Sequence, residues 1–214
     1  MRYLAESIGT FFLVGVVVGS GIMAENLSNG NNAVALLGNT IATGAILFVL
    51  IKMFSSISGA HFNPAVSLVF YLRKELNIKD FFNYTIIQII SGLLAVLCIH
   101  YIFQIELFQI STNIRGKLPL FVSEIIATFG LVLTILLIRK NDEKSVAIGV
   151  ALFIMAGYWF TSSTSFANPA VTISRMFTNT FTGIAPASLV YFLCGQIVGC
   201  IIANYIFNIF NNSK

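Results

Sequence analysis

The tripeptide Asn63-Pro64-Ala65 decides the fold of this chain, because it returns in the second half of the sequence as Asn168-Pro169-Ala170. Each copy follows a run of small polar residues and opens a segment with the pattern of a short helix. Proline suits the first turn of a helix, where its missing N–H costs no hydrogen bond, and asparagine suits the capping position before it. The sequence therefore predicts two short helices whose first turns present unpaired N–H groups and a positive dipole end.

Apolar stretches of membrane-spanning length surround both tripeptides. The 214 residues are 57% hydrophobic and only 9% charged, and the mean hydropathy is +0.89. Irregular backbone at membrane depth must be buried in protein or line a water-filled cavity, because lipid cannot satisfy its polar groups. We therefore predict an integral membrane protein of one domain, residues 1–214, which lies in the lipid bilayer and carries a polar route across it.

Several stretches have the length of about twenty residues that a membrane-spanning helix needs. We predict helices near residues 3–24, 33–54, 81–103, 119–138, 145–160 and 186–209. Pro64 and Pro169 begin the two short helices, while Pro119 and Pro186 begin the fourth and sixth spans. A cleavable signal peptide is the alternative for the first span, but that span is too long for one and further spans follow it.

The basic residues predict the orientation of the chain in the membrane. With the N-terminus inside, nine of them lie on the inner side and three on the outer side. This excess favours cytoplasmic N- and C-termini in a cell (inner) membrane. The same residues are scattered rather than gathered in a stripe, so we expect no nucleic-acid partner. The inner set is Arg2, Lys52, Arg73, Lys74, Lys79, Arg139, Lys140, Lys144 and Lys214, and the outer set is Arg115, Lys117 and Arg175.

Further features recur in the same order in the two halves of the chain. Ala5–Phe11 resembles Ser123–Phe129, and Gln88 and Gln196 begin similar segments. Each half holds an odd number of spans, so the second half enters the membrane upside down relative to the first. The two short helices then meet near the midplane, where their dipoles and asparagine amides favour a water or hydroxyl oxygen and oppose protons and metal cations. We place the two repeats at approximately residues 1–104 and 119–214.

The residues around both tripeptides resemble those of the major intrinsic proteins, the aquaporins and glycerol facilitators, over essentially the whole chain. The approach Ser58–Val66 to the first tripeptide and a membrane glutamate opening each half carry the likeness. The resemblance implies an all-α membrane protein with six transmembrane helices plus two re-entrant half-helices in an inverted 3+3 repeat. It also implies one pore per subunit, a homotetramer, and passive flow of water and small neutral solutes.

Glu6, Glu124 and His61 are ionisable residues at membrane depth, which makes each a functional candidate. The glutamates could bind protons in a coupled transporter, and His61 could sense pH. The resemblance implies instead that the glutamates accept backbone hydrogen bonds from the re-entrant loops. Irregular backbone beside His61 needs hydrogen-bond partners, so we expect His61 to help fix its loop.

An outer constriction is the next feature that the resemblance implies. Most family members have an arginine where this chain has Val171, and water-selective members have a bulky aromatic where it has Thr43. Small, uncharged side chains here predict a wide filter that admits bulkier neutral solutes. They also predict a weaker barrier to protons. The constriction is placed at Thr43, Ala156, Ser165 and Val171, with Gly157 and Phe166 as alternatives for the middle two positions.

Arg175 lies one turn beyond Val171 on the same face of the second short helix, from where it could reach back and replace the missing charge. A half-helix leaving the midplane has risen roughly 10 Å by its seventh residue, so we place Arg175 at the outer mouth instead. The run Asn168–Arg175 resembles that of a bacterial subgroup associated with arsenic resistance. That likeness implies neutral arsenite or methylated arsenicals as further solutes.

We therefore predict a passive channel for water and small uncharged solutes, such as glycerol-like polyols and neutral metalloids. The alternatives are a strictly water-selective aquaporin and a coupled secondary transporter, since transporters also use inverted repeats and broken helices. The sequence offers no nucleophile, metal cluster or phosphate loop, so we expect no enzyme activity, cofactor or metal. Cys98, Cys194 and Cys200 lie in apolar stretches without metal-ligand spacing, and we predict that they are packing residues.

Overall fold

The computed structural model describes residues 1–212 of the chain, and every regular element in that range is a helix. Six helices there are long and apolar enough to cross a membrane, whereas α3 and α7 are much shorter and begin at the prolines of the repeated tripeptides. Lys214, one of the predicted inner-side charges, lies outside the described residues. The elements are α1 (Arg2–Leu27), α2 (Asn32–Ser58), α3 (Pro64–Leu72), α4 (Ile78–Ile102), α5 (Leu118–Asn141), η1 (Glu143–Ser145), α6 (Val146–Phe160), α7 (Pro169–Arg175), η2 (Pro186–Ser188) and α8 (Leu189–Asn212).

Local capping explains where the helices begin and end. The predicted third span starts late, because the side chain of Asn77 accepts a hydrogen bond from the backbone N–H of Asp80 and α4 already begins at Ile78. The predicted second span stops early, because α2 continues to Ser58. That helix ends only at Gly59, whose φ of 88° places it in the left-handed region that favours glycine.

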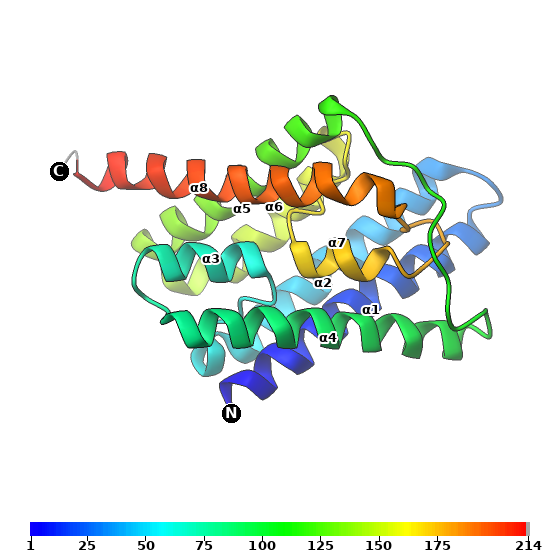
Figure 1. Ribbon diagram of the computed structural model, residues 1–214, viewed down its shortest axis with the longest axis horizontal. Coiled ribbons are helices and arrows are strands. Elements are labelled where there is room, and N and C mark those ends of the chain that lie inside the picture. The colour runs from blue at the N-terminus through cyan, green and yellow to red at the C-terminus, as the bar shows by residue number, and fades with distance from the viewer. Residues whose placement is uncertain (213–214) are drawn as a thin grey trace.

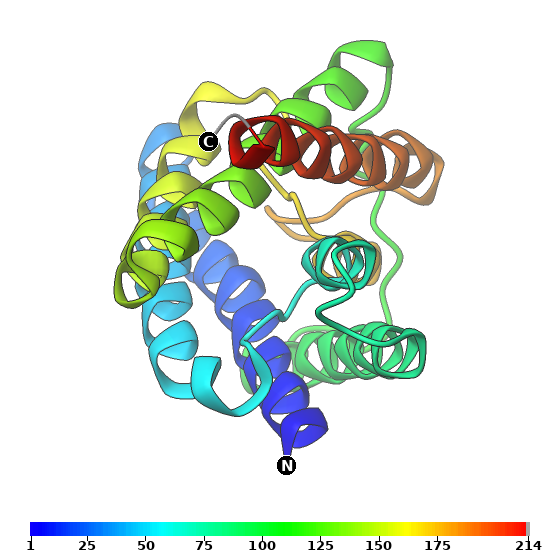
Figure 2. The same ribbon diagram turned by 90° about the vertical axis from the view of Figure 1, so that its left-hand side faces the viewer.

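The two half-helices lie end to end in the middle of the bundle, between α4 and α8 (Figure 1). α3 runs from the middle of the molecule toward the face where α1 begins and α8 ends, which we call the terminal face. α7 runs the other way, toward the opposite or distal face. Seen from the terminal face, the long helices surround the two loops that lead into α3 and α7 (Figure 2). The repeated tripeptides therefore meet near the centre of the molecule.

The two halves of the chain use the same packing in opposite orientations. α1 packs on α2 and α4, and α5 packs on α6 and α8 in the same order. α1 begins at the terminal face, whereas α5 begins at the distal face (Figure 1). The predicted fold class, six transmembrane helices plus two re-entrant half-helices in an inverted 3+3 repeat, is confirmed.

Burial follows the pattern of a protein that is dissolved in lipid. Large apolar side chains are exposed along the outer helix faces, for example Ile86, Ile90 and Leu94 on α4. Polar side chains are instead enclosed, and the carboxylates of Glu6 and Glu124 are fully buried. Since the bilayer accepts apolar surface and rejects polar groups, the polar interior is where a functional site is to be sought.

Candidate functional site

Two strained loops lead into the half-helices. Ala60 and Phe62 have φ angles of 52° and 48°, and Ser165 and Ala167, at the equivalent positions of the second loop, have φ angles of 50° and 47°. Residues with a Cβ rarely adopt this left-handed conformation, because the side chain crowds the backbone. Each loop therefore needs support from the surrounding helices to hold its shape.

One buried glutamate supports each loop. Glu6 on α1 accepts hydrogen bonds from the backbone N–H of His61 at 2.9 Å and of Phe62 at 2.7 Å. Glu124 on α5 accepts the equivalent pair from Phe166 at 3.0 Å and Ala167 at 2.9 Å. These are the contacts that the family resemblance implied for the two glutamates. Buried N–H groups that would otherwise lack partners are thereby satisfied.

A glutamine ties each glutamate to its half-helix. Nε2 of Gln88 donates to Glu6 at 2.8 Å and to the Ser67 hydroxyl at 3.3 Å. Nε2 of Gln196 donates to Glu124 at 2.6 Å and to the Thr172 hydroxyl at 2.8 Å. The sequence showed both glutamines as a repeat but did not indicate this role. The hydroxyl that lies four residues after each pore asparagine is the signal that could have revealed it, since that spacing places it one turn into the half-helix.

The asparagines of the two tripeptides cap their own half-helices and hold the opposite loop. Oδ1 of Asn63 accepts from the N–H of Ala65 at 2.8 Å, while its Nδ2 donates to the carbonyl of Ala167 at 2.7 Å. Asn168 accepts from the N–H of Ala170 at 3.0 Å and donates to the carbonyl of Phe62 at 2.9 Å. The two halves are therefore cross-linked at the point where both helix dipoles begin.

A cavity of about 1060 Å³ runs along these groups. Its lining includes Lys52 and Arg139 toward the terminal face, Asn63 and Asn168 at the centre, and Arg175 toward the distal face. Apolar side chains from four long helices complete the wall. They include Leu13 and Val17 of α1, Leu47 and Ile51 of α2, Leu131 and Ile135 of α5, and Val150 and Ile154 of α6. Polar groups therefore line part of the cavity along its length, and apolar side chains line the rest.

The structure corrects one residue of the predicted constriction. Thr43, Ser165 and Val171 line the cavity, but Ala156 is exposed on the outer surface of α6. The helical repeat is the reason, since Ile154 and Tyr158 face the cavity one turn apart and the residue midway between them points away. Tyr158, which the sequence did not suggest, lines the cavity with its hydroxyl 3.1 Å from that of Thr43.

The alternatives named for the constriction also have clear positions. Gly157 is buried behind Ser165, and a Cβ placed on it would come within 2.6 Å of the Ser165 hydroxyl. Phe166 lines the cavity, and its ring lies 4.7 Å from that of Phe192 in an edge-to-face arrangement. The cavity lining therefore combines the small side chains of Thr43, Ser165 and Val171 with two aromatic rings, those of Tyr158 and Phe166.

Arg175 lies inside the cavity and not at the outer mouth, the position predicted from the rise along the half-helix. Its side chain is only 3% exposed and lines the cavity. The guanidinium carbon lies 3.4 Å from the centre of the Phe166 ring, and Nε donates to the carbonyl of Thr182. The rise along the half-helix was a misleading guide, because helical side chains point back toward the N-terminus of their own helix.

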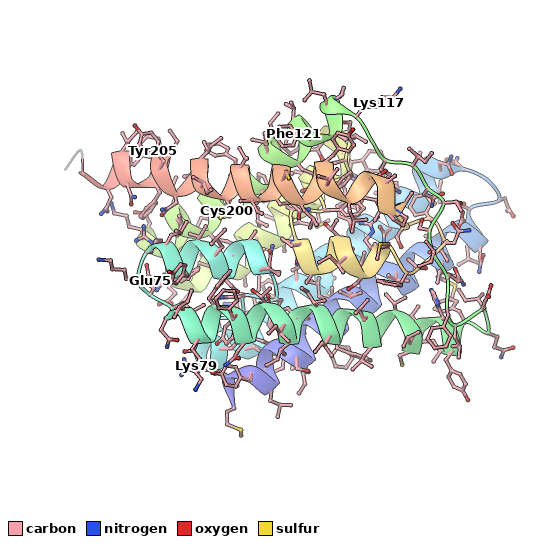
Figure 3. The ribbon with its side chains drawn as sticks, viewed as in Figure 1. Glu75, Lys79, Lys117, Phe121, Cys200 and Tyr205 are labelled. Carbon is pink, nitrogen blue, oxygen red and sulfur yellow. The ribbon has the colours of Figure 1, made fainter. Side chains whose placement is uncertain are left out.

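His61 lies beside the first tripeptide and lines the cavity as well. Its Nδ1 is 3.1 Å from the Ser67 hydroxyl, and its ring packs 4.6 Å from Phe70 and 5.3 Å from Tyr84. Cys200 contacts the same half-helix from α8, with its thiol 3.2 Å from the Ala65 carbonyl (Figure 3). Both side chains therefore contact α3 or the loop before it.

Comparison with known proteins identifies the family of this chain. The family described as major intrinsic protein matches residues 1–156. The chain belongs to the major intrinsic protein family. A curated relative, the aquaglyceroporin AqpS of Rhizobium meliloti (strain 1021), is 46% identical over 202 residues, which cover 94% of this chain and 86% of the relative. A probable TIP-type aquaporin of Medicago truncatula is 32% identical over 181 residues, which cover 78% and 71% of the two chains.

A solved structure extends the likeness to the fold of the major intrinsic proteins. The aquaglyceroporin from Plasmodium falciparum superposes with a TM-score of 0.77 over 98% of this chain and 96% of its own, at 17% sequence identity. As a member of this channel family, the chain is an integral membrane channel for water and small uncharged solutes.

Proposed function

We propose that this channel passes glycerol-sized polyols and neutral metalloids such as arsenite and methylated arsenicals, as well as water. The single observation that carries this proposal is the short, uncharged side chain of Val171, which lines the cavity. Ser165 and Thr43, which also have short side chains, line it too. The 46% identical relative is named an aquaglyceroporin, which supports solutes of glycerol size.

The proposed centre of the pathway is the pair of tripeptides, Asn63-Pro64-Ala65 and Asn168-Pro169-Ala170. Each asparagine amide uses one N–H on the opposite loop and keeps a second N–H. Both side chains line the cavity, so a solute oxygen that passes there meets donors from both halves. The two positive helix ends oppose a cation at the same point.

Glu6, Glu124 and His61 are proposed to support the loops and not to carry protons. Each glutamate already accepts two backbone hydrogen bonds and one from a glutamine, all of which favour its role as a fixed acceptor. A proton relay needs a second acid within reach. Among the described residues, no ion pair or hydrogen bond joins either glutamate to another acid.

The proposed assembly is a homotetramer in the cell (inner) membrane, with one pore per subunit and both termini in the cytoplasm. Glu75 and Lys79 lie at the terminal face, and Lys117 lies at the distal face (Figure 3). Most of the basic residues belong to the terminal side, which favours the cytoplasm for that side. A single domain of two repeats, residues 1–104 and 119–214, is part of the same proposal.

Permeation of liposomes that carry the purified protein tests the solute range. Stopped-flow light scattering compares water, glycerol and neutral arsenite for the native chain and for Val171→Arg. We expect native vesicles to pass all three, and the substitution to suppress the larger solutes while it spares water. A strictly water-selective aquaporin is the second candidate, because Tyr158 and Arg175 also line the constriction. Native vesicles that pass water alone would establish it and end the metalloid proposal.

A further inference from the structure

We propose that Arg175 is the solute-contacting charge of the outer constriction, displaced by one helical turn from the position that Val171 occupies. This inference rests on the proposed function, since it assigns a specificity-determining residue to the same pathway. It reverses the expectation that a filter without an arginine at position 171 lacks a positive charge.

The first argument is placement. Arg175 follows Val171 by four residues on α7, so the two side chains share one face of that half-helix. Both line the cavity, and Arg175 is only 3% exposed. A snorkelling arginine would instead extend its head into water or headgroups. The long side chain of Arg175 thus places its guanidinium over the ring of Phe166, in the loop before α7.

The second argument concerns the hydrogen bonds of the guanidinium. Nε donates to the carbonyl of Thr182, and the guanidinium makes no other hydrogen bond within residues 1–212. Its two terminal nitrogens are not among the fully enclosed polar atoms that lack partners. They therefore face the open space that Arg175 lines, which is the cavity. A guanidinium has five N–H donors, so about four remain for a solute oxygen or water.

The third argument is that neighbouring groups hold the guanidinium in place. It stacks on the Phe166 ring at 3.4 Å, a geometry that suits a planar cation on an aromatic face. The backbone carbonyl of Arg175 accepts from the N–H of Ile184 at 3.1 Å, which returns the chain after α7 to the same side. The Thr182 carbonyl is thereby kept beside Nε.

Arg115 fixes this arrangement from outside the cavity. Its Nε donates to the carbonyl of Gly183 at 2.9 Å and its Nη2 to the carbonyl of Phe181 at 3.1 Å. Its guanidinium carbon lies 5.6 Å from the centre of the Phe166 ring, but it does not line the cavity. Two arginines thus clamp one short segment, and only one of them faces the pathway.

No ion pair within residues 1–212 offsets the charge on Arg175. None of the ion pairs formed by residues 1–212 includes Arg175 or Arg115. A positive charge that lines the cavity repels cations that pass it. The constriction therefore suits a neutral molecule with a hydroxyl oxygen for Arg175 and an apolar flank for Phe166. It should exclude protons and metal cations even though position 171 is a valine.

Proton leak into liposomes, followed with an internal pH dye under an imposed potential, tests this role. Arg175→Met keeps the length of the side chain and removes the charge and the donors. We expect its leak to exceed that of the native protein about tenfold, because one nearby charge changes the energy of a cation in the passage by well over RT. Arg175→Lys keeps the charge, so its leak should stay near native. Its glycerol-to-water permeability ratio should change, because lysine lacks the planar fork.

Arg115→Met is the matched control, since it removes the second arginine over the same Phe166 ring from outside the cavity. At equal protein content its leak should rise far less than that of Arg175→Met, because its guanidinium supports the segment but does not line the cavity. A native-like leak in Arg175→Met would overturn the proposal, and so would an equal rise in Arg115→Met, which would mean that the segment had merely loosened. If Arg175→Met does not fold, native-like behaviour of Arg175→Lys in both leak and solute ratio overturns the proposal. Native vesicles that pass only water would refute the proposed solute range. A proton leak that is larger in Arg175→Met than in Arg115→Met would still support the role of Arg175 in that case.

Discussion

At the residue scale, the position of Ser165 depends on the absence of a side chain at Gly157. A Cβ on Gly157 would lie 2.6 Å from the Ser165 hydroxyl and 2.7 Å from its Cβ. Such contacts are too short, so Ser165 must move if Gly157 gains a methyl group. Because Ser165 lines the cavity, that movement changes the shape of the outer constriction.

Gly157→Ala should therefore lower glycerol permeability by about tenfold, the effect of one added methyl group in a tight site. Water needs less room, so its permeability should fall much less. Stopped-flow light scattering with both permeants measures the ratio. Ala156→Val is the control, since Ala156 is exposed on the outer surface of the same helix. Equal losses for water and glycerol in Gly157→Ala would contradict a local effect on the filter.

The sequence alone did not determine which side chains line the cavity. Two predictions failed because they depend on how a helix is rotated in the bundle or on how far a long side chain extends. Thr43, Ser165 and Val171 line the cavity, while their role as a filter stays a prediction. Ala156 was wrong because family spacing was carried onto a helix whose rotation is fixed only by packing. Arg175 was wrong because the path of a long side chain depends on a ring and a carbonyl that the fold brings to it.

At the element scale, two glycines set the distance between α5 and α8. A Cβ on Gly199 would lie 2.5 Å from the Ile125 carbonyl, and one on Gly195 would lie 2.7 Å from that of Phe121. Both contacts are with backbone, which cannot rotate away. Gly15, in the similar Gly-x-x-x-Gly pattern of α1, meets only side chains at 3.8 Å or more. The same sequence pattern therefore has different consequences in the two halves.

Gly199→Ala should lower the free energy of unfolding by about 1–3 kcal/mol, the usual cost of overpacking. Gly15→Ala should change it little, and it serves as the control for the lower flexibility of alanine. Thermal unfolding of both variants in detergent, followed by the loss of the folded peak in size exclusion, makes the comparison. If the two variants unfold at the same temperature, α8 can move away from α5 without a loss of stability, and the prediction is wrong.

Glu75 joins the turn after α3 to the end of α5 on the terminal face. It forms ion pairs with Arg139 of α5 and with Arg73. Burial alone would raise the pKa of Glu75, but hydrogen bonds from Arg139 and Arg73 bring it below its ordinary value of 4.5. A carboxylate with a lowered pKa stabilises the folded state fully above its unfolded pKa, and that stability is lost as the pH falls through the folded pKa.

Glu75→Gln should therefore lower the unfolding temperature at neutral pH by an amount equivalent to about 1 kcal/mol or less, since the ion pairs are partly exposed. The difference from the native protein should shrink as the pH falls from about 4.5 through the lower folded pKa of Glu75, because the native side chain loses its charge over that range. Unfolding temperatures measured across this range test the expectation. Glu143→Gln is the control, because Glu143 is 80% exposed and lies 4.0 Å from Arg139. A difference that persists unchanged in acid would assign the effect to packing.

The elements themselves were largely predictable, because prolines, apolar runs and turn residues are local signals. The two half-helices followed from the repeated tripeptides, in which an asparagine cap precedes Pro64 and Pro169. Helix ends were less predictable, as at Asn77, because a cap depends on a single side-chain hydrogen bond. The supporting roles of Gln88 and Gln196 were beyond prediction, since their partners lie in other elements.

At the scale of the whole molecule, each half of the chain holds the re-entrant loop of the other half at the centre of the cavity. Asn63 holds the loop of the second half through the Ala167 carbonyl, and Asn168 holds the loop of the first through the Phe62 carbonyl. The sequence indicated this meeting point through the repeated tripeptides and the odd number of spans in each half. The reciprocal hydrogen bonds could not be read from it, because they join residues that are far apart along the chain.

These reciprocal hydrogen bonds allow a test of how the whole channel excludes cations. In Asn168→Asp, one carboxylate oxygen can still cap α7 through the N–H groups of Ala170 and Val171. The other oxygen faces the Phe62 carbonyl without a hydrogen to donate and adds a negative charge to the cavity. We expect the leak of protons or monovalent cations to rise by about tenfold, because that charge offsets the two positive helix ends.

Water permeability should stay within about twofold of native, because the half-helix keeps its cap. Asn39→Asp is the matched control, since Asn39 also donates to a backbone carbonyl, that of Val17 at 2.8 Å, but does not line the cavity. Cation flux into liposomes with an ion-sensitive dye, beside water permeability by light scattering, separates the two variants. If Asn39→Asp leaks as much as Asn168→Asp, loss of packing and not charge at the midplane explains the leak. If neither leaks, Arg175 at the outer constriction holds enough of the barrier to exclude cations without the midplane.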